Sequence, residues 1–297
     1  MRLGLRPGGA IMAITSDFLA IYSGLFTASF GTIYQAEGKL RKTIHASRVF
    51  HNVHDSNLNI SRAGAVNMVP LTSFQSDIAS GNIDVQNINM TFSPKVRKDA
   101  LGEYELVNFR PDVVPTLAYD HALAVTRYED NEIIKGLTAG KSATIADGGT
   151  NMTTDKLVEA RYMLGQNNVS GMLHLVMTWS QYKSMLGEIQ FTDSSFSSGQ
   201  ALVNPGVSQA MFAGFNITIL GNVMDGATNL GLPKTGDIRK CYAFSDTSML
   251  LAYQKETATR VVHIPQNLRM EVITAASISS KAYDSLGIIE IDCDETA

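Results

Sequence analysis

The chain has 297 residues, of which 44% are hydrophobic and 18% are charged, and its net charge is −4. This length allows one large domain or two ordinary ones with a buried core, while the charged share lies below the usual quarter or so. The mild charge excludes a strong long-range attraction to nucleic acid or an anionic membrane, and the few charges favour a surface covered by other copies.

An uncharged stretch, residues 18–36, follows a flexible leader at 1–11. Its large apolar side chains recur every three or four positions: Phe18, Leu19, Tyr22, Leu25, Phe26, Phe30, Ile33 and Tyr34. The opposite side is small and mostly polar, whereas a membrane helix would be apolar all round. We therefore expect an amphipathic helix that docks on protein, and neither a membrane span nor a secretory signal. Met1 and Met12 both remain open as the start of translation.

The densest group of cations comes directly after this helix and consists of Lys39, Arg41, Lys42 and Arg48. It is either a solvated helix end that suits the negative end of the helix dipole or a surface facing a polyanion. Nearby lie four possible metal ligands, His45, His51, His54 and Asp55. Their spacing is not that of the familiar zinc sites and no cysteine accompanies them, so we expect no metal site.

Residues 49–110 show partial alternation with many Asn and Thr, which predicts an extended, two-stranded excursion that needs neighbours for its stability. Residues 111–137 form the strongest predicted helix, with Pro111 and Pro115 at its entrance and Gly140 as a stop. Its expected core face comprises Val114, Leu117, Ala118, His121, Ala122, Val125 and Tyr128. Its charged residues, Asp120, Arg127, Glu129, Asp130 and Glu132, are expected mostly elsewhere.

The segment Gly136–Ser142, part of "GLTAGKSA", is similar to a phosphate-binding loop. That motif needs four residues between its glycines, and it follows a buried strand and opens a helix. Here three residues separate Gly136 from Gly140, and the segment comes after a helix. We therefore interpret it as the end of the helix and not as a nucleotide site.

From Lys141 onward a mixed α/β pattern is expected. It predicts a helix at 153–169 capped by Thr153, a buried strand at 172–178, a helix "WSQYKSML", a strand at 212–223 and a strand-rich end. In the last strand Ile289 and Ile291 alternate with Glu290 and Asp292, as in a half-buried strand. Cys241 and Cys293 are far apart in sequence and are interpreted as reduced thiols. No nucleophile, cofactor or metal motif is present, so we expect neither catalytic residues nor a cofactor.

In order, these elements resemble the major capsid proteins of tailed bacteriophages, which have the Johnson, or Hong Kong 97-like, α+β fold. The sequence "YQAEGKLR" is similar to the end of the N-terminal arm of a subgroup, and "AYDHALAVTRYEDNEII" to its spine helix. "VMTWSQYKSML" followed by "FAGFNITILGNV" resembles the strand, helix and strand of its axial domain. The resemblance covers nearly the whole chain from about Met12.

The resemblance implies a division into leader and N-terminal arm at 1–48, extended-loop region at 49–110 and peripheral-domain spine helix at 111–139. The axial domain is expected at 140–250 and the returning peripheral strands at 251–297. Little precedes Ala13, so a separate scaffolding protein or a mature form is expected in place of a cleaved extension.

The implied function is structural: hexamers and pentamers of this chain tile the icosahedral head of a phage and enclose double-stranded DNA, without catalysis. Further implied partners are a portal protein and a decoration protein, with assembly in the host cytoplasm and residence in the virion. The cations at 39–48 are expected to face DNA phosphates or acidic residues of a neighbour. Two alternatives stay open: a nanocompartment shell of the same fold, and a nucleotide-binding enzyme that uses Gly136–Ser142.

Overall fold

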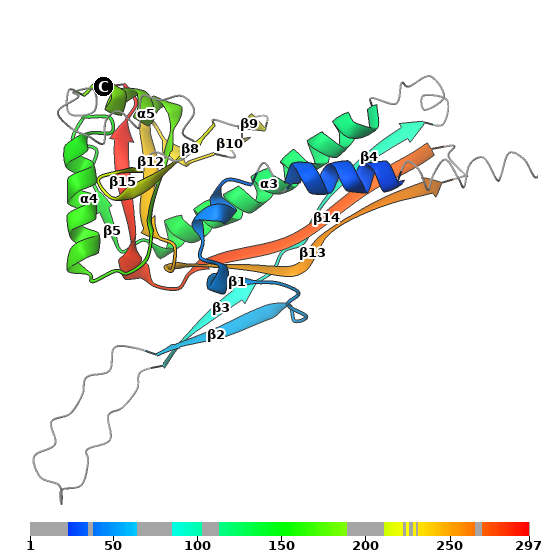
Figure 1. Ribbon diagram of the computed structural model, residues 1–297, viewed down its shortest axis with the longest axis horizontal. Helices are drawn as coiled ribbons and strands as arrows, with labels where there is room; N and C mark the ends of the chain where they lie inside the picture. Colours follow the sequence, from blue (N-terminus) through cyan, green and yellow to red (C-terminus); the bar gives the residue numbers. More distant parts are fainter. Residues whose placement is uncertain are drawn as a thin grey trace, which may run out of the picture.

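The computed structural model describes residues 23–34, 38–63, 85–102, 113–188, 211–221, 224–225, 228–229, 231–264 and 269–296. Figure 1 shows two parts, which we call the broad lobe and the slender lobe. The broad lobe is an upright sheet with two short helices, and the slender lobe is a long helix lying along a narrow sheet. A two-stranded ribbon projects from the slender lobe close to where the lobes meet.

The broad lobe contains a seven-stranded mixed sheet of order β5-β15-β12-β6-β8-β7, with β11 paired to β12. Its strands are β5 (Ala143–Ile145), β6 (Leu173–Thr178), β7 (Met211–Phe212), β8 (Phe215–Leu220), β11 (Lys234–Thr235), β12 (Ile238–Ser245) and β15 (Ile288–Asp294). Its helices are α4 (Thr154–Gln166) and α5 (Trp179–Leu186), and a separate pair is formed by β9 (Met224–Asp225) and β10 (Thr228–Asn229). β12 is antiparallel to its neighbours β15 and β6.

Local sequence explains how these elements begin. The Thr153 side chain accepts a hydrogen bond from the Lys156 amide and caps α4, as residues with a side-chain oxygen do at a helix start. Every residue of β6 is buried, as expected for a continuous apolar run covered on both faces. The predicted helix start at Thr153, the buried strand at 172–178 and the helix at Trp179 are all confirmed.

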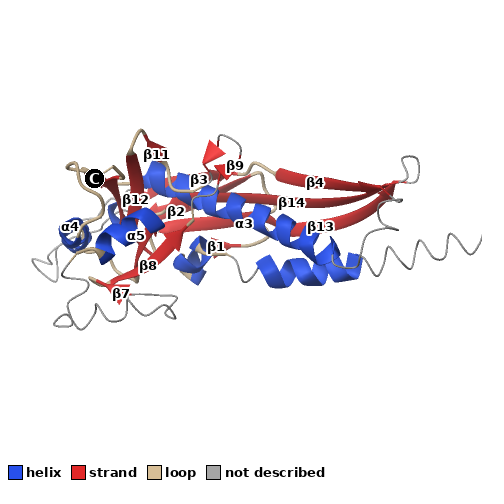
Figure 2. Ribbon diagram, turned by 90° about the horizontal axis from the view of Figure 1, so that it is seen from above, coloured by secondary structure: helices blue, strands red, loops and turns tan. Residues whose placement is uncertain are grey.

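The slender lobe has a four-stranded sheet of order β1-β13-β14-β4. Its strands are β1 (Val49–Phe50), β4 (Lys95–Gly102), β13 (Met249–Ile264) and β14 (Arg269–Ala282), and its helix is α3 (Val113–Gly140). Figures 1 and 2 show α3 running along this sheet, and its main contact is with β14. Of the predicted core face, Ala118, His121, Ala122 and Val125 are buried, and Leu117 and Tyr128 are partly buried against the core. The helix ends at Gly140, the predicted stop.

The ribbon consists of β2 (Asn57–Ala63) and β3 (Val85–Thr91), which pair antiparallel. Its base is anchored because Met90 is fully buried against Leu250 and Ala252 of β13. The predicted two-stranded excursion is thereby confirmed, although 64–84 and 103–110 lie outside the described residues. Within 49–110, the segment Lys95–Gly102 behaves differently, because it pairs with β14 as an edge strand of the slender lobe.

The last strand differs from its expected half-buried, peripheral character. β15 lies inside the seven-stranded sheet between β5 and β12, although residues 251–297 were expected to return to the peripheral sheet as one unit. Ile288, Ile289, Glu290 and Ile291 are all buried. The alternation suggested an exposed Glu290, but this carboxylate is buried and its charge is balanced by lysines of the protein.

The N-terminal helix, described over residues 23–34, lies beside α3 (Figures 1 and 2). Phe26 and Phe30 are buried, which confirms docking on protein, whereas Leu25 of the predicted stripe is exposed. Short 3-10 helices follow at η1 (Leu40–Thr43) and η2 (Ala46–Arg48), and a further one is η4 (Ser285–Gly287). Within the described ranges, the helices are too short or too polar to cross a membrane.

Candidate functional site

The two arginines of the predicted basic cluster pack on aromatic rings of their own chain. The Arg41 guanidinium lies 5.8 Å from the ring centre of Tyr34 and 5.5 Å from that of Tyr253. The Arg48 guanidinium lies 3.7 Å from the ring centre of Tyr283. Such contacts combine electrostatic attraction with packing, so both arginines help to fix the segment between the N-terminal helix and β1.

The two lysines of the cluster are the exposed members. Lys39 places Nζ 3.4 Å from the carbonyl oxygen of Ile219, on the broad lobe, and Lys42 is also exposed. The structure therefore separates the cluster into two arginines used for internal packing and two lysines at the surface. A contact of this cluster with DNA or with a neighbouring subunit stays a proposal.

A buried carboxylate, Glu129 of α3, joins three elements of the slender lobe. The Tyr34 hydroxyl donates to Oε2 and the Tyr253 hydroxyl donates to Oε1, each at 2.6 Å. Burial first, and then the charge of Glu129, raises the pKa of both tyrosines, so both hydroxyls stay protonated and able to donate. The carboxylate thus ties the N-terminal helix and β13 to α3.

Sequence reasoning missed this role, because Glu129 was expected away from the core face. It follows Val125 by four residues and Ala122 by seven, which places it on the same helical stripe. A charged residue within an apolar stripe is the signal that could have identified it. Only 1% of Glu129 is exposed, which shows that the stripe continues through it.

The next residue, Asp130, holds the start of η1. Its Oδ1 accepts a hydrogen bond of 3.2 Å from the Leu40 amide. Burial raises the pKa of Asp130 to about 7, the bond from Leu40 lowers it and the nearby charge of Glu129 raises it. The neighbouring carboxylates Glu129 and Asp130 therefore attach Tyr34 and Leu40, respectively, to α3.

Replacing Asp130 with asparagine is expected to stabilise the protein at pH 8, because the amide keeps an acceptor for Leu40 without a partly buried charge. A raised pKa means that the folded state binds the proton more tightly, so this contribution to stability is lost as pH rises from about 4 through about 7. The gain of the variant should grow over that range to a few kcal/mol and then level off. Urea unfolding at a series of pH values checks this. A gain that is the same at pH 4 and pH 8 would contradict it.

The segment Gly136–Ser142 has no free phosphate cradle. Gly136 and Gly140 belong to α3, and both the Ser142 amide and its hydroxyl donate to the carbonyl oxygen of Ile288, at 3.0 Å each. A phosphate-binding loop needs its backbone N–H groups free and pointing at the ligand. The segment instead links the end of α3 to β15.

Lys141 is also engaged, in a charged cluster between the lobes. Glu290, fully buried on β15, accepts from Lys141 at 2.5 Å and from Lys240 at 3.0 Å. Burial alone would raise the pKa of Glu290, but the two lysines outweigh it and hold the pKa below its ordinary value. The Tyr242 hydroxyl lies 3.3 Å from the same carboxylate and 2.8 Å from Thr138 of α3. The cluster fixes the crossing from α3 to the broad lobe.

The histidine-rich segment does not assemble a metal site in the part of the chain that is described. His45 Nδ1 lies 2.8 Å from the Ser47 hydroxyl, and His51 stacks on Tyr253 with ring centres 5.1 Å apart. No three His, Cys, Asp or Glu side chains among the described residues are grouped so as to hold a metal ion. The buried Cys241 and Cys293 are free thiols.

The fold matches that of viral shell proteins. A cyanophage P-SCSP1u capsid chain has a TM-score of 0.68 at 12% identity, with 86% of this chain and 88% of that one covered. A chain of Mycobacterium phage Che8 has a TM-score of 0.63 at 13% identity, covering 86% and 92%. A virus-like particle from Pyrococcus furiosus has a TM-score of 0.58 at 10% identity, covering 93% and 99%. No curated protein matches the chain.

The solved structures share too little sequence identity with this chain to assign its family, and the assignment comes instead from a match to a protein family. The family described as phage capsid protein matches residues 20–295, which is nearly the whole chain. The match spans the N-terminal helix, the ribbon, α3 and both sheets, so the expected Hong Kong 97-like α+β fold is confirmed. The chain belongs to the phage capsid protein family.

Proposed function

We propose that copies of this major capsid protein assemble into the hexamers and pentamers of an icosahedral phage head, which encloses double-stranded DNA. The family and the shell proteins of similar fold support a structural role. We further propose that the protein has no catalytic role, with the slender lobe as the peripheral domain and the broad lobe as the axial domain.

The ribbon is the observation that carries this proposal. Beyond its base, β3 is mostly exposed, and a two-stranded ribbon is at best marginally stable by itself in water. Figure 1 shows it extending away from both lobes. Such an element gains its stability from a surface outside its own subunit, and another copy is the surface that a shell provides. Many modest contacts of this kind then add up through multivalency.

The remaining partners follow from the assembly of a phage head. We propose a separate scaffolding protein, a portal protein, a decoration protein and assembly in the host cytoplasm. Lys39 and Lys42, the exposed members of the basic cluster, are proposed to face either DNA or acidic residues of a neighbour.

A nanocompartment shell of the same fold is the second candidate, since a virus-like particle from Pyrococcus furiosus also has a similar fold. The nucleic-acid content of native particles separates the two candidates. Packaged double-stranded DNA supports the phage head, whereas particles that contain protein cargo and no genome support the nanocompartment.

Negative-stain electron microscopy of the purified protein tests the proposed function directly. We expect closed shells or ring-shaped hexamers and pentamers. A protein that remains a discrete monomer or dimer with scaffolding protein present would rule the proposal out.

Shortening the ribbon should abolish assembly and spare folding. Residues 63–85 are replaced by Asn-Gly, because Arg62 and Gln86 are directly paired and a two-residue turn of this type suits such a pair. The variant keeps Met90 at the base and the ion pair of 2.9 Å between Arg62 and Asp284. Thermal melting should match the wild type within a few degrees, while microscopy should show no shells. Normal shells would show that the outer ribbon makes no essential contact.

A further inference from the structure

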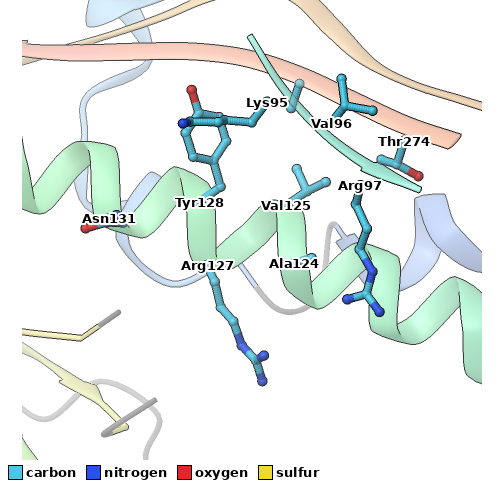
Figure 3. Close-up of a pocket in the computed structure, with 10 residues that line it drawn as sticks. Lys95, Val96, Arg97, Ala124, Val125, Arg127, Tyr128, Asn131 and Thr274 are labelled. Atoms are coloured by element: carbon cyan, nitrogen blue, oxygen red, sulfur yellow. The ribbon is translucent and has the colours of Figure 1, made fainter. Parts of the chain in front are cut away.

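A hollow of about 480 Å³ lies between α3 and β4 of the slender lobe. Figure 3 shows it in close-up, with side chains from α3 on one side and from β4 and β14 on the other. β4 is an edge strand, so the hollow opens at the border of the sheet.

The charged side chains that line the hollow are all cations. Lys95 and Arg97 of β4 and Arg127 of α3 line it, and its lining residues include no carboxylate. Lys95 and Arg127 are exposed and have no hydrogen-bond or ion-pair partner among the described residues. Lys95 and Arg127 therefore place two positive charges from different elements at the rim of the hollow, and Figure 3 shows Arg127 extending from α3 away from β4.

The third cation is held in place. Arg97 donates from Nε to Asp99 at 3.1 Å and from Nη1 to the carbonyl oxygen of Asp120 at 3.2 Å. Asp99 also lies 2.8 Å from Nε2 of the buried His121. These contacts direct the Arg97 guanidinium from β4 toward α3, as Figure 3 shows, and they occupy the carboxylate of Asp99.

Further exposed cations lie on the other flank of the same helix. Figure 2 shows β4 on one side of α3 and the N-terminal helix on the other. Lys39 and Lys42 follow the N-terminal helix and are exposed. Arg127, on α3, lies between the two flanks. Exposed positive charge thus lies on three elements, spread out and not gathered at one point, with Lys39 beside the broad lobe and the exposed Asp120 also on α3.

The lining of the hollow has few groups that could recognise nucleic-acid bases. Its one aromatic residue, Tyr128, donates its hydroxyl to the carbonyl oxygen of Ser93 at 2.8 Å, with that of Ile278 at 3.3 Å. Proteins that bind single strands use exposed aromatic rings on which bases stack, whereas contacts to a duplex backbone need only cations and carry no sequence information. The lining therefore suits a duplex backbone better than unpaired bases.

We propose that the hollow between β4 and α3 is a contact site for the phosphate backbone of double-stranded nucleic acid, with Lys95 and Arg127 as the phosphate-binding side chains. This rests on the proposed function in that the enclosed DNA is the nucleic acid concerned. It adds the place of contact and the residues, and it assigns Arg97 to positioning within the site. An acidic segment of a second copy would be attracted by the same charges but would not need them spread over three elements.

The test measures binding of a fluorescently labelled 30-base-pair duplex to the purified full-length chain by anisotropy, over a series of salt concentrations. The double variant Lys95→Gln/Arg127→Gln is compared with Arg161→Gln/Lys183→Gln, which removes the same charge from exposed positions on α4 and α5. The first should bind roughly tenfold more weakly at low salt, and its slope of log K against log salt should be flatter by about 1.8, the value for two lost phosphate contacts. The control should keep the wild-type slope.

Three results would overturn the proposal. They are no duplex binding by the wild type, equal losses in both double variants, and wild-type duplex binding by the Lys95/Arg127 variant. If that variant binds duplex normally but forms no shells, the hollow is a contact between copies. Electron microscopy of the same samples measures assembly separately. If the wild type forms no shells but the Lys95/Arg127 variant alone loses duplex binding, the proposed site stands and the proposed function fails.

Discussion

Replacing Gly140 with alanine is expected to lower the free energy of unfolding by roughly 2–3 kcal/mol, the cost of inserting a group into a packed interior. A Cβ at Gly140 would overlap the Cβ of Ala282 on β14. Because an alanine side chain has no rotamer through which to move away, α3 and β14 would have to separate. Gly136, one turn earlier, is similarly close, since its Cβ would lie 2.8 Å from the Met249 Cε and 3.0 Å from the Ser280 Oγ.

Gly165→Ala is the matched control, because the substitution is the same and the site lies in another helix of the same chain. A Cβ at Gly165 meets nothing within 4 Å, so this variant should be unchanged or more stable by up to about 1 kcal/mol, as glycine disfavours helices. Urea unfolding of both variants gives the comparison. Equal stabilities would show that α3 and β14 are not in close contact at Gly140.

These glycines show what local sequence patterns can predict and what they cannot. The pattern identified the helix, its core face and the wrong spacing for a phosphate loop, and all three follow from residues near one another in the chain. It also predicted Gly140 as the end of the helix, which is correct, because a glycine after an apolar stripe commonly ends a helix. What local patterns could not show is why a side chain is excluded there: β14 approaches both glycines and Met249 of β13 approaches Gly136. These contacts join residues more than 100 positions apart, which no local sequence pattern records.

The charged clusters were missed for the same physical reason. Glu129 meets Tyr34 and Tyr253 across 95 and 124 residues, and Lys141 meets Glu290 across 149. A buried carboxylate is tolerable only where such partners exist, so its burial follows from the tertiary fold. A single sequence therefore predicts the order and kind of the elements, and through family resemblance the fold, but not which charges are internal.

Replacing Glu129 with alanine is expected to cost roughly 3–5 kcal/mol, the range for removing one partner of a buried charged network. The change removes the acceptor of two hydrogen bonds and leaves the hydroxyls of Tyr34 and Tyr253 unpaired in a buried place, which is more costly than losing an exposed contact. Because these tyrosines belong to the N-terminal helix and to β13, both elements should loosen from α3. Thermal melting by circular dichroism measures the loss.

Glu132→Ala provides the control, since it removes the same side chain less than one turn away in α3. Glu132 pairs with Lys135, whose side chain is 61% exposed, and exposed pairs contribute little, generally less than about 1 kcal/mol. A second readout localises the effect, because trypsin cleaves after the exposed Lys39 and Lys42. Loss of the Tyr34 anchor should speed that cleavage in Glu129→Ala and not in Glu132→Ala. If the two variants melt and digest alike, the carboxylate does not hold the N-terminal helix, and its attachment rests on Phe26, Phe30 and the Asp130 contact alone.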